Sequence, residues 1–281
     1  MTIQIATVPY CNAFPLIHYL PEYLPHALIS ECIPSAMRQQ LVEQKIDLAL
    51  MPVAELAFLP QSKIMSNCCI ACDGEVRSVL LFSRKPLEQI QTIAMDTASR
   101  SSVTICELIL RHFYGLQPEK HRLEQHQHPD DCRTDAFVII GDRALAYQPS
   151  ERWCYRYDIG ELWKEKTRLP LVFAAWIGTQ VEESAIVTAL QASRDRGLQQ
   201  LETILDAKER QGVALPLDRE QILDYYRRAI IYTMGKGEHA GLQCFFDLMR
   251  QSNDTVREGV HSKSACCLPR FAKALTLVLP R

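Results

Sequence analysis

The chain has 281 residues, of which 47% are hydrophobic and 23% charged, and its formal net charge is −2 at pH 7. This length and hydrophobic content suffice for a sizeable core and favour two lobes over one. A nearly neutral chain has no global attraction to nucleic acid or to an anionic membrane. We find no basic, apolar leader and no run near 18 apolar residues, so we expect a cytoplasmic protein without nucleic-acid or membrane partners.

Strands and helices alternate over the first part of the chain. Buried strands are predicted at residues 3–8, 27–33 and 46–51, each followed by a helix. In the first helix, Asn12 occupies an N-cap position and Pro15 the first turn, where a missing N–H costs little. The order β-α-β-α-β-α predicts a parallel α/β sheet whose ligands bind beyond the carboxyl ends of the strands.

A long β-type run at residues 74–83 and an apolar run at residues 169–177 enclose a second β-α-β-α segment. One lobe inserted into another through two crossings predicts a hinge with a ligand cleft at the crossings. The expected division is a first lobe of residues 1–84 and 177–250, an inserted second lobe of residues 85–176, and an atypical C-terminal tail of residues 251–281.

A polar turn at residues 96–102 lies between the apolar run 93–95 and a helix predicted to end near Gly115. It brings hydroxyls and free backbone N–H groups to the positive end of a helix dipole, which suits an anion such as a carboxylate. The alternative is that Ser101 or Ser102 only caps the helix.

Metal-ligand residue types occur twice, but in unsuitable patterns. Zinc at Cys68, Cys69 and Cys72 would need a fourth ligand and usually a second paired motif, and none follows at a normal spacing. The histidine-rich stretch 112–132 is polar and irregularly spaced, so we expect a solvated loop. The eleven cysteines are expected to be reduced thiols. We therefore predict no metal site.

Five motifs lie in order along residues 3–250. They are Val8-Pro9-Tyr10-x-Asn12-Ala13-x-Pro15-Leu16, Cys72-Asp73-Gly74-x-Val76-x-Ser78-Val79, Ser99-Arg100-Ser101-Ser102-Val103, Ile140-Gly141-Asp142-x-Ala144-Leu145, and Asp158-Ile159-Gly160-Glu161-Leu162-Trp163 with Leu169 to Trp176. Together they resemble the chorismate dehydratase family (MqnA) of the futalosine route to menaquinone. The resemblance implies a two-lobe periplasmic-binding-protein-like (type II) α/β fold with the substrate cleft at the hinge between the lobes.

The resemblance also implies an activity and a set of site residues. The reaction is the loss of water from chorismate to give 3-[(1-carboxyvinyl)oxy]benzoate, a hydro-lyase step that needs no cofactor or metal. The family's active-site Asn and Ser fall on Asn12 and Ser78, which we expect to be catalytic. The expected substrate-binding residues are Ser99, Ser101, Ser102 and Asp142.

The proton acceptor stays open at this point. No His falls in a matching motif, and Asp142 at a helix start serves equally well as a cap or a base. We suggest that the enolpyruvyl carboxylate of the substrate takes the proton, with Ser78 and Asn12 hydrogen-bonding that carboxylate or the departing hydroxyl. Without the resemblance, the alternative has equal weight, because a Ser on a hinge strand and an Asn at a cap are also common where they serve no function.

Two departures and two alternatives accompany this interpretation. Glu75 stands where the family usually has Pro, and residues 251–281 do not resemble its usual helical end, so we expect part of this tail to be poorly ordered. The alternatives are 1,4-dihydroxy-6-naphthoate synthase of the same pathway, expected to carry a His base, and a non-catalytic cytoplasmic protein that binds a small carboxylate. No oligomeric state follows from the composition.

Overall fold

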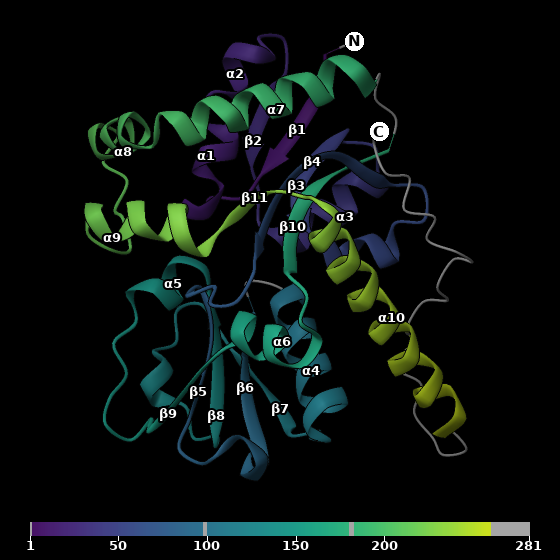
Figure 1. Ribbon diagram of the computed structural model, residues 1–281, viewed down its shortest axis with the longest axis vertical. Helices are drawn as coiled ribbons and strands as arrows, with labels where there is room; N and C mark the ends of the chain where they lie inside the picture. The colour runs from purple at the N-terminus through teal and green to yellow at the C-terminus, as the bar shows by residue number, and fades with distance from the viewer. Residues whose placement is uncertain (1, 98–99, 180–182, 260–281) are drawn as a thin grey trace.

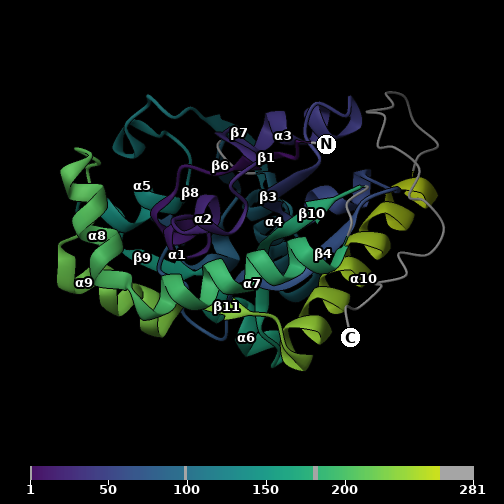
Figure 2. The same cartoon turned by 90° about the horizontal axis from the view of Figure 1, so that it is seen from above.

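The computed structural model describes residues 2–97, 100–179 and 183–259, and its chain forms two sheets with helices packed around each (Figures 1 and 2). The six-stranded sheet has the order β11-β4-β10-β3-β1-β2, and the five-stranded sheet has the order β7-β6-β8-β5-β9. We call the parts of the chain built on these sheets the first lobe and the second lobe.

The first lobe contains both ends of the described chain. Its strands are β1 (Gln4–Thr7), β2 (Leu28–Glu31), β3 (Leu48–Pro52), β4 (Lys63–Cys72), β10 (Leu171–Gly178) and β11 (Ile231–Thr233). Its helical segments are η1 (Cys11–Ala13), α1 (Phe14–Ile17), α2 (Leu20–Tyr23), α3 (Pro34–Val42), η2 (Val53–Phe58), α7 (Glu183–Gln199), α8 (Leu201–Arg210), α9 (Arg219–Asp224), the π-helical turn η5 (Tyr225–Ala229) and α10 (Lys236–Gly259). β1 pairs in parallel with β2 and β3, whereas β10 and β11 run antiparallel to their neighbours.

The second lobe is one continuous piece of chain. Its strands are β5 (Val79–Ser83), β6 (Thr92–Asp96), β7 (Glu119–Leu123), β8 (Ala136–Ile140) and β9 (Tyr155–Asp158). Its helical segments are η3 (Leu87–Gln89), α4 (Arg100–Tyr114), η4 (Pro129–Asp131), α5 (Gly141–Ala146) and α6 (Ile159–Thr167). β6 runs parallel to β7 and β8, and β5 runs antiparallel to β8 and β9.

Burial explains which segments became central strands. Every residue of β3, β5 and β8 is buried, as expected for apolar strands covered on both faces. The edge strands β2 and β7 are mostly exposed. One hydrophobic core cluster continues from the first lobe into the second. The long helix α10 packs against β10 of the first lobe and α4 of the second, and therefore ties the lobes together (Figure 1).

The chain crosses between the lobes at other residues than expected. β5 belongs to the second sheet, although residues 79–83 were assigned to the first lobe. Conversely, β10 lies in the first sheet, although residues 171–176 were assigned to the second lobe. The crossings therefore lie at 73–78 and 168–170. The sequence analysis missed the first crossing because the alternating, strand-like pattern of residues 74–83 continues through it.

The tail does not begin where the sequence suggested. α10 continues through residue 251 to Gly259, so the expected start of the tail lies inside a helix. Residues 260–281, for which partial disorder was expected, lie outside the described residues. No helix in the described part of the chain combines the length and the apolar character needed to cross a membrane.

Candidate active site

A cavity with about 560 Å³ of free space, its open mouth included, lies between the lobes at the first crossing. Its lining residues are Val8, Tyr10, Asn12, Pro34, Pro52, Ile70, Phe173 and Ala174 from the first lobe, Val76 and Ser78 from the crossing, and Val79, Ser102, Ile140 and Gly141 from the second lobe. The expected Asn12, Ser78 and Ser102 thus line one cavity.

Asn12 reaches the cavity from η1, the short turn after β1. It is not the N-cap that the sequence suggested, because α1 begins after Ala13 and no side chain caps either segment. Instead its Oδ1 atom is buried and has no hydrogen-bond partner among the described residues. A buried acceptor without a partner is costly unless a ligand satisfies it. Asn12 therefore offers the cavity an unused hydrogen-bond acceptor.

Ser78 is placed by a tight turn in the crossing, because the predicted strand 74–83 is regular only from Val79 onward. The Ser78 N–H donates to the Val76 carbonyl at 2.8 Å, around Arg77 with a φ of 62°. An i to i+2 hydrogen bond around a residue with positive φ is the pattern of a strained γ-turn. The turn reverses the chain just before Ser78, whose side chain is 2% exposed.

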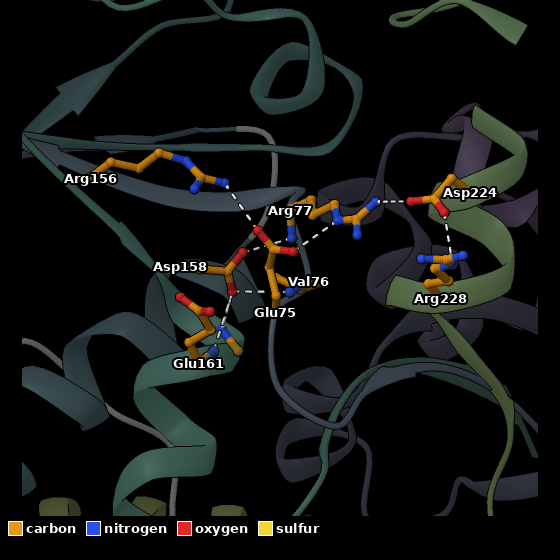
Figure 3. A network of polar contacts seen from close by, with 9 residues as sticks. Glu75, Val76, Arg77, Arg156, Asp158, Glu161, Asp224 and Arg228 are labelled. Carbon is orange, nitrogen blue, oxygen red and sulfur yellow. Dashed lines mark hydrogen bonds and ion pairs between the residues drawn. The ribbon is translucent and has the colours of Figure 1, made fainter. Parts of the chain in front are cut away.

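Asp158, at the end of β9, holds this turn (Figure 3). Its Oδ1 accepts from the N–H of Val76 at 3.0 Å and its Oδ2 from the N–H of Arg77 at 2.7 Å. Oδ1 also caps α6 through the N–H groups of Gly160 and Glu161. Burial raises the pKa of Asp158, although the four N–H groups act in the opposite direction. One carboxylate thus joins the start of α6 to the residues before Ser78.

The Arg77 side chain connects the same turn to α9 (Figure 3). Its guanidinium contacts Glu75 at 2.9 Å and Asp224 at 2.7 Å. Arg156 of the second lobe approaches Glu75 at 3.6 Å, and Arg228 pairs with Asp224 at 2.9 Å. Glu75, where the resembling family usually has Pro, is therefore a member of a charged network around the crossing. Since these side chains are partly exposed, each pair alone contributes little stability.

The Ser-rich turn is described only in part. Ser99 and the side chain of Ser101 lie outside the described residues, and α4 starts at Arg100. Ser102 is buried and lines the cavity from the first turn of α4. Asp96, before this turn, accepts a hydrogen bond from Gln125 and lies 3.6 Å from Arg143. The amino-terminal end of α4 therefore faces the cavity through Ser102.

Asp142 contacts the other lobe. Its carboxylate accepts from the Cys11 N–H at 3.1 and 3.2 Å, and burial raises its pKa. Its neighbour Gly141 donates its N–H to the Ser78 carbonyl at 2.7 Å. Gly141 has a φ of 62°, and a Cβ there would lie 3.2 Å from the Tyr10 ring, so a side chain would be both strained and crowded. The start of α5 thus holds both η1 and Ser78, and Asp142 is not among the described lining residues.

The described part of the cavity lining carries no Asp, Glu, Lys, Arg or His side chain. Its phenol, Tyr10, has a pKa raised to about 12 by burial and by the charges of Asp96 and Asp142. At neutral pH this lining is therefore un-ionised. It can bind an anion through hydroxyl, amide and backbone N–H groups, and it offers no ordinary general base.

Three buried tyrosines behind the cavity escaped the sequence analysis. The Tyr225 hydroxyl donates to Ser78 Oγ at 2.9 Å. The hydroxyls of Tyr226 and Tyr232 donate to the backbone carbonyls of Cys11 at 2.9 Å and Asn12 at 3.0 Å. The sequence carries one signal for their burial, the adjacent pair Tyr225 and Tyr226 inside an amphipathic helical pattern. Two adjacent residues do not both fit the apolar face of a regular helix, so the pair indicates a local departure from helical geometry.

The metal-ligand residue types do not gather into a site. The Cys68, Cys69 and Cys72 side chains are buried in β4, and burial raises the pKa of each thiol. No group of three or more His, Cys, Asp or Glu side chains in the described ranges is arranged to hold a metal ion.

Among solved structures, the chain is similar to a protein of Archaeoglobus fulgidus, with a TM-score of 0.69 at 14% identity over 90% of this chain and 98% of that chain. It is also similar to the periplasmic aliphatic sulphonate binding protein SsuA of Escherichia coli, with a TM-score of 0.60 at 15% identity over 90% and 92% of the two chains. These likenesses confirm the periplasmic-binding-protein-like fold.

Two curated relatives are named chorismate dehydratase. The Thermus thermophilus protein is 26% identical over 260 residues, which cover 85% of this chain and 92% of the relative. The Campylobacter jejuni protein is 27% identical over 173 residues, 59% of this chain and 63% of the relative. The model of a family described as menaquinone biosynthesis matches residues 3–251. With nearly the whole described chain matched, this protein belongs to the menaquinone biosynthesis family.

Proposed function

We propose that this protein is a chorismate dehydratase, a hydro-lyase that converts chorismate to 3-[(1-carboxyvinyl)oxy]benzoate and water. Membership of the menaquinone biosynthesis family and the names of the two relatives support the proposal. The observation that carries it is the cavity itself: Asn12 and Ser78 meet there in a lining without an ionised side chain among its described residues. Such a site suits a reaction whose substrate brings its own base.

The chemistry is an elimination that aromatises the ring. The C3–H bond breaks and its proton passes to the enolpyruvyl carboxylate of the substrate, the electron pair forms the new ring double bond, and the C4–O bond breaks. The departing hydroxide takes this proton from the enolpyruvyl carboxyl group, which restores the carboxylate, so the net product beside the benzoate is one water. Aromatisation supplies the thermodynamic drive, and the protein's main contribution is orientation.

Each proposed residue has one task in this scheme. Ser78 donates a hydrogen bond to the enolpyruvyl carboxylate or to the departing hydroxyl, and the unused Oδ1 of Asn12 accepts one from the C4 hydroxyl. Ser102 and the start of α4, with Ser99 and Ser101 of the same sequence motif, bind the ring carboxylate. Asp142 contributes by holding η1, and with it Asn12, through the Cys11 N–H.

The first experiment is incubation of the purified protein with chorismate, without metal or nucleotide, followed by ultraviolet absorption and product mass. We expect loss of one water and a benzoate-type spectrum. Ser78→Ala should lower kcat/KM by about 100-fold or more, the cost of removing one transition-state donor. Ser83→Ala is the matched control, because Ser83 is an equally buried serine of the adjoining strand β5 and does not line the cavity.

The outcomes separate the alternatives. Saturable binding of chorismate without turnover would contradict the dehydratase and favour a non-catalytic carboxylate-binding protein of the same fold. Near-native turnover by Ser78→Ala would remove Ser78 from the mechanism and keep the activity. The naphthoate synthase alternative is disfavoured because no His belongs to the described cavity lining, and turnover of a nucleoside-derived cyclic substrate in place of chorismate would restore it.

A further inference from the structure

Two consecutive side-chain pairs join the end of α9 to the crossing. Asp224 pairs with Arg77 at 2.7 Å, and the next residues along each segment, Tyr225 and Ser78, are linked by a hydrogen bond of 2.9 Å. The side chains of the first pair are about one third exposed, whereas Tyr225 and Ser78 are 0% and 2% exposed. The two contacts together fix which residue of η5 faces Ser78.

The π-helical turn η5 explains how two adjacent tyrosines both face inward. In a regular α-helix, neighbouring side chains diverge by about 100° because each turn holds 3.6 residues. In η5 the turn is wider, and both Tyr225 and Tyr226 are buried. Tyr226 donates to the backbone carbonyl of Cys11, whereas Tyr225 donates to a side chain that lines the cavity. Such π-turns often occur at functional sites.

The Tyr225 phenol is the donor in its hydrogen bond with Ser78. Burial, above all, raises the pKa of Tyr225 well above its ordinary value, so the phenol keeps its single proton. That proton is donated to Ser78 Oγ. The side chain of Asn12 also contacts this phenol and lowers its pKa, by less than burial raises it. The Tyr225 hydroxyl therefore lies between both residues expected to be catalytic.

We propose that Tyr225 is the positioning residue of Ser78. By donating to Ser78 Oγ, the phenol fixes the serine rotamer and leaves the serine's own proton for an acceptor in the cavity. Without the phenol oxygen, Ser78 is free to turn and to donate elsewhere, so fewer molecules present a correctly directed donor. The inference rests on the proposed function, in which the acceptor is the enolpyruvyl carboxylate or the departing hydroxyl of chorismate.

The test is a double-mutant cycle of Tyr225→Phe and Ser78→Ala, with chorismate as substrate. We expect Tyr225→Phe to lower kcat about tenfold, the effect of one misdirected hydrogen bond, with KM changed less than about twofold. In the Ser78→Ala background the same change should have no further effect on kcat, because the group it positions is gone. Tyr226→Phe is the matched control, a similarly buried neighbour whose hydroxyl donates to a backbone carbonyl and not to Ser78.

Each other outcome overturns a specific statement. If the losses in kcat multiply in the double variant, or if Tyr226→Phe lowers kcat as much as Tyr225→Phe, Tyr225 has only a structural role. If the wild type turns over chorismate and Tyr225→Phe equals it, the inference fails and the function stands. If the wild type has no turnover, the proposed function fails. The contact is then tested by measuring the urea midpoint of unfolding for the same two single variants and the double variant. Additive shifts in the midpoint would exclude coupling between the two hydroxyls.

Discussion

Asp158→Ala should destabilise the protein strongly, because four backbone N–H groups share one carboxylate. Two of them, from Val76 at 3.0 Å and Gly160 at 2.9 Å, are fully buried, whereas those of Arg77 and Glu161 are partly exposed. A buried donor left without an acceptor costs about 1–3 kcal/mol, so the two buried donors together predict a loss of about 4 kcal/mol in the free energy of unfolding.

Asp158→Asn should remove only part of this stabilisation. The amide oxygen can keep the three contacts of Oδ1, but the amide nitrogen then faces the N–H of Arg77, donor against donor. Because burial raises the pKa of Asp158, the neutral amide also relieves part of the cost of burying a charge. We therefore expect a net loss of only about 1 kcal/mol, together with lower turnover, since Ser78 follows the disturbed turn.

The assay is equilibrium unfolding in urea at pH 7.5, with tryptophan fluorescence and circular dichroism required to coincide. The control is Asp218→Ala, which removes the exposed N-cap of α9 and should cost about 1 kcal/mol, as N-caps do. If Asp158→Ala lost no more stability than Asp218→Ala, the role of Asp158 in holding the crossing would be refuted.

Three further predictions concern other parts of the molecule. Gly197→Ala should lower Tm in calorimetry by several degrees, because its Cβ would lie 1.9 Å from the Pro15 carbonyl and force α7 away from α1; an unchanged Tm would contradict this close approach. Among the described cysteines, iodoacetamide should label exposed Cys154 well before buried Cys106, because burial raises the pKa of the Cys106 thiol. Peptide mass mapping measures the order of labelling, and labelling of Cys106 before Cys154 would contradict this prediction. Burial raises the folded-state pKa of Asp142, so the ionised carboxylate destabilises the folded protein, and this cost disappears as pH falls through the raised pKa toward about 4. Asp142→Asn should therefore compare more favourably with wild type at pH 7 than at pH 4 in urea unfolding, and equal differences at both pH values would contradict the shift.

Local patterns predicted much of the fold. The predicted strand 3–8 contains β1, and the predicted strand 46–51 contains β3 except its last residue, Pro52; β1 and β3 pair in parallel as expected. The polar residues that follow strands, Asn12 and Ser102, line the same cavity as Ser78 because the strand ends of both lobes meet at the crossing. These features depend on periodicity and on strand-to-helix junctions, which are local properties of a sequence.

The rest depends on contacts between distant residues. A positive φ at Arg77 is unusual for a residue with a Cβ, and it is stabilised by Asp158, 81 residues further along the chain. The contact of Tyr225 with Ser78 spans 147 residues. Neither pairing leaves a local signal, so the turn at the crossing and the tyrosines behind the cavity became visible only in the folded chain.

The insertion of the second lobe into the first sheet imposes an order on folding. β10 lies between β3 and β4, yet it follows β4 only after the whole second lobe has been synthesised. On the ribosome, the second lobe can complete its sheet as one continuous piece before β10, the strand that pairs with both β3 and β4, has been synthesised. Closing so long a loop is slow, and η5 follows later still. A nascent chain that ends before Tyr225 therefore has every described lining residue but lacks the hydroxyl that contacts Ser78, so the proposed positioning of Ser78 comes late in synthesis.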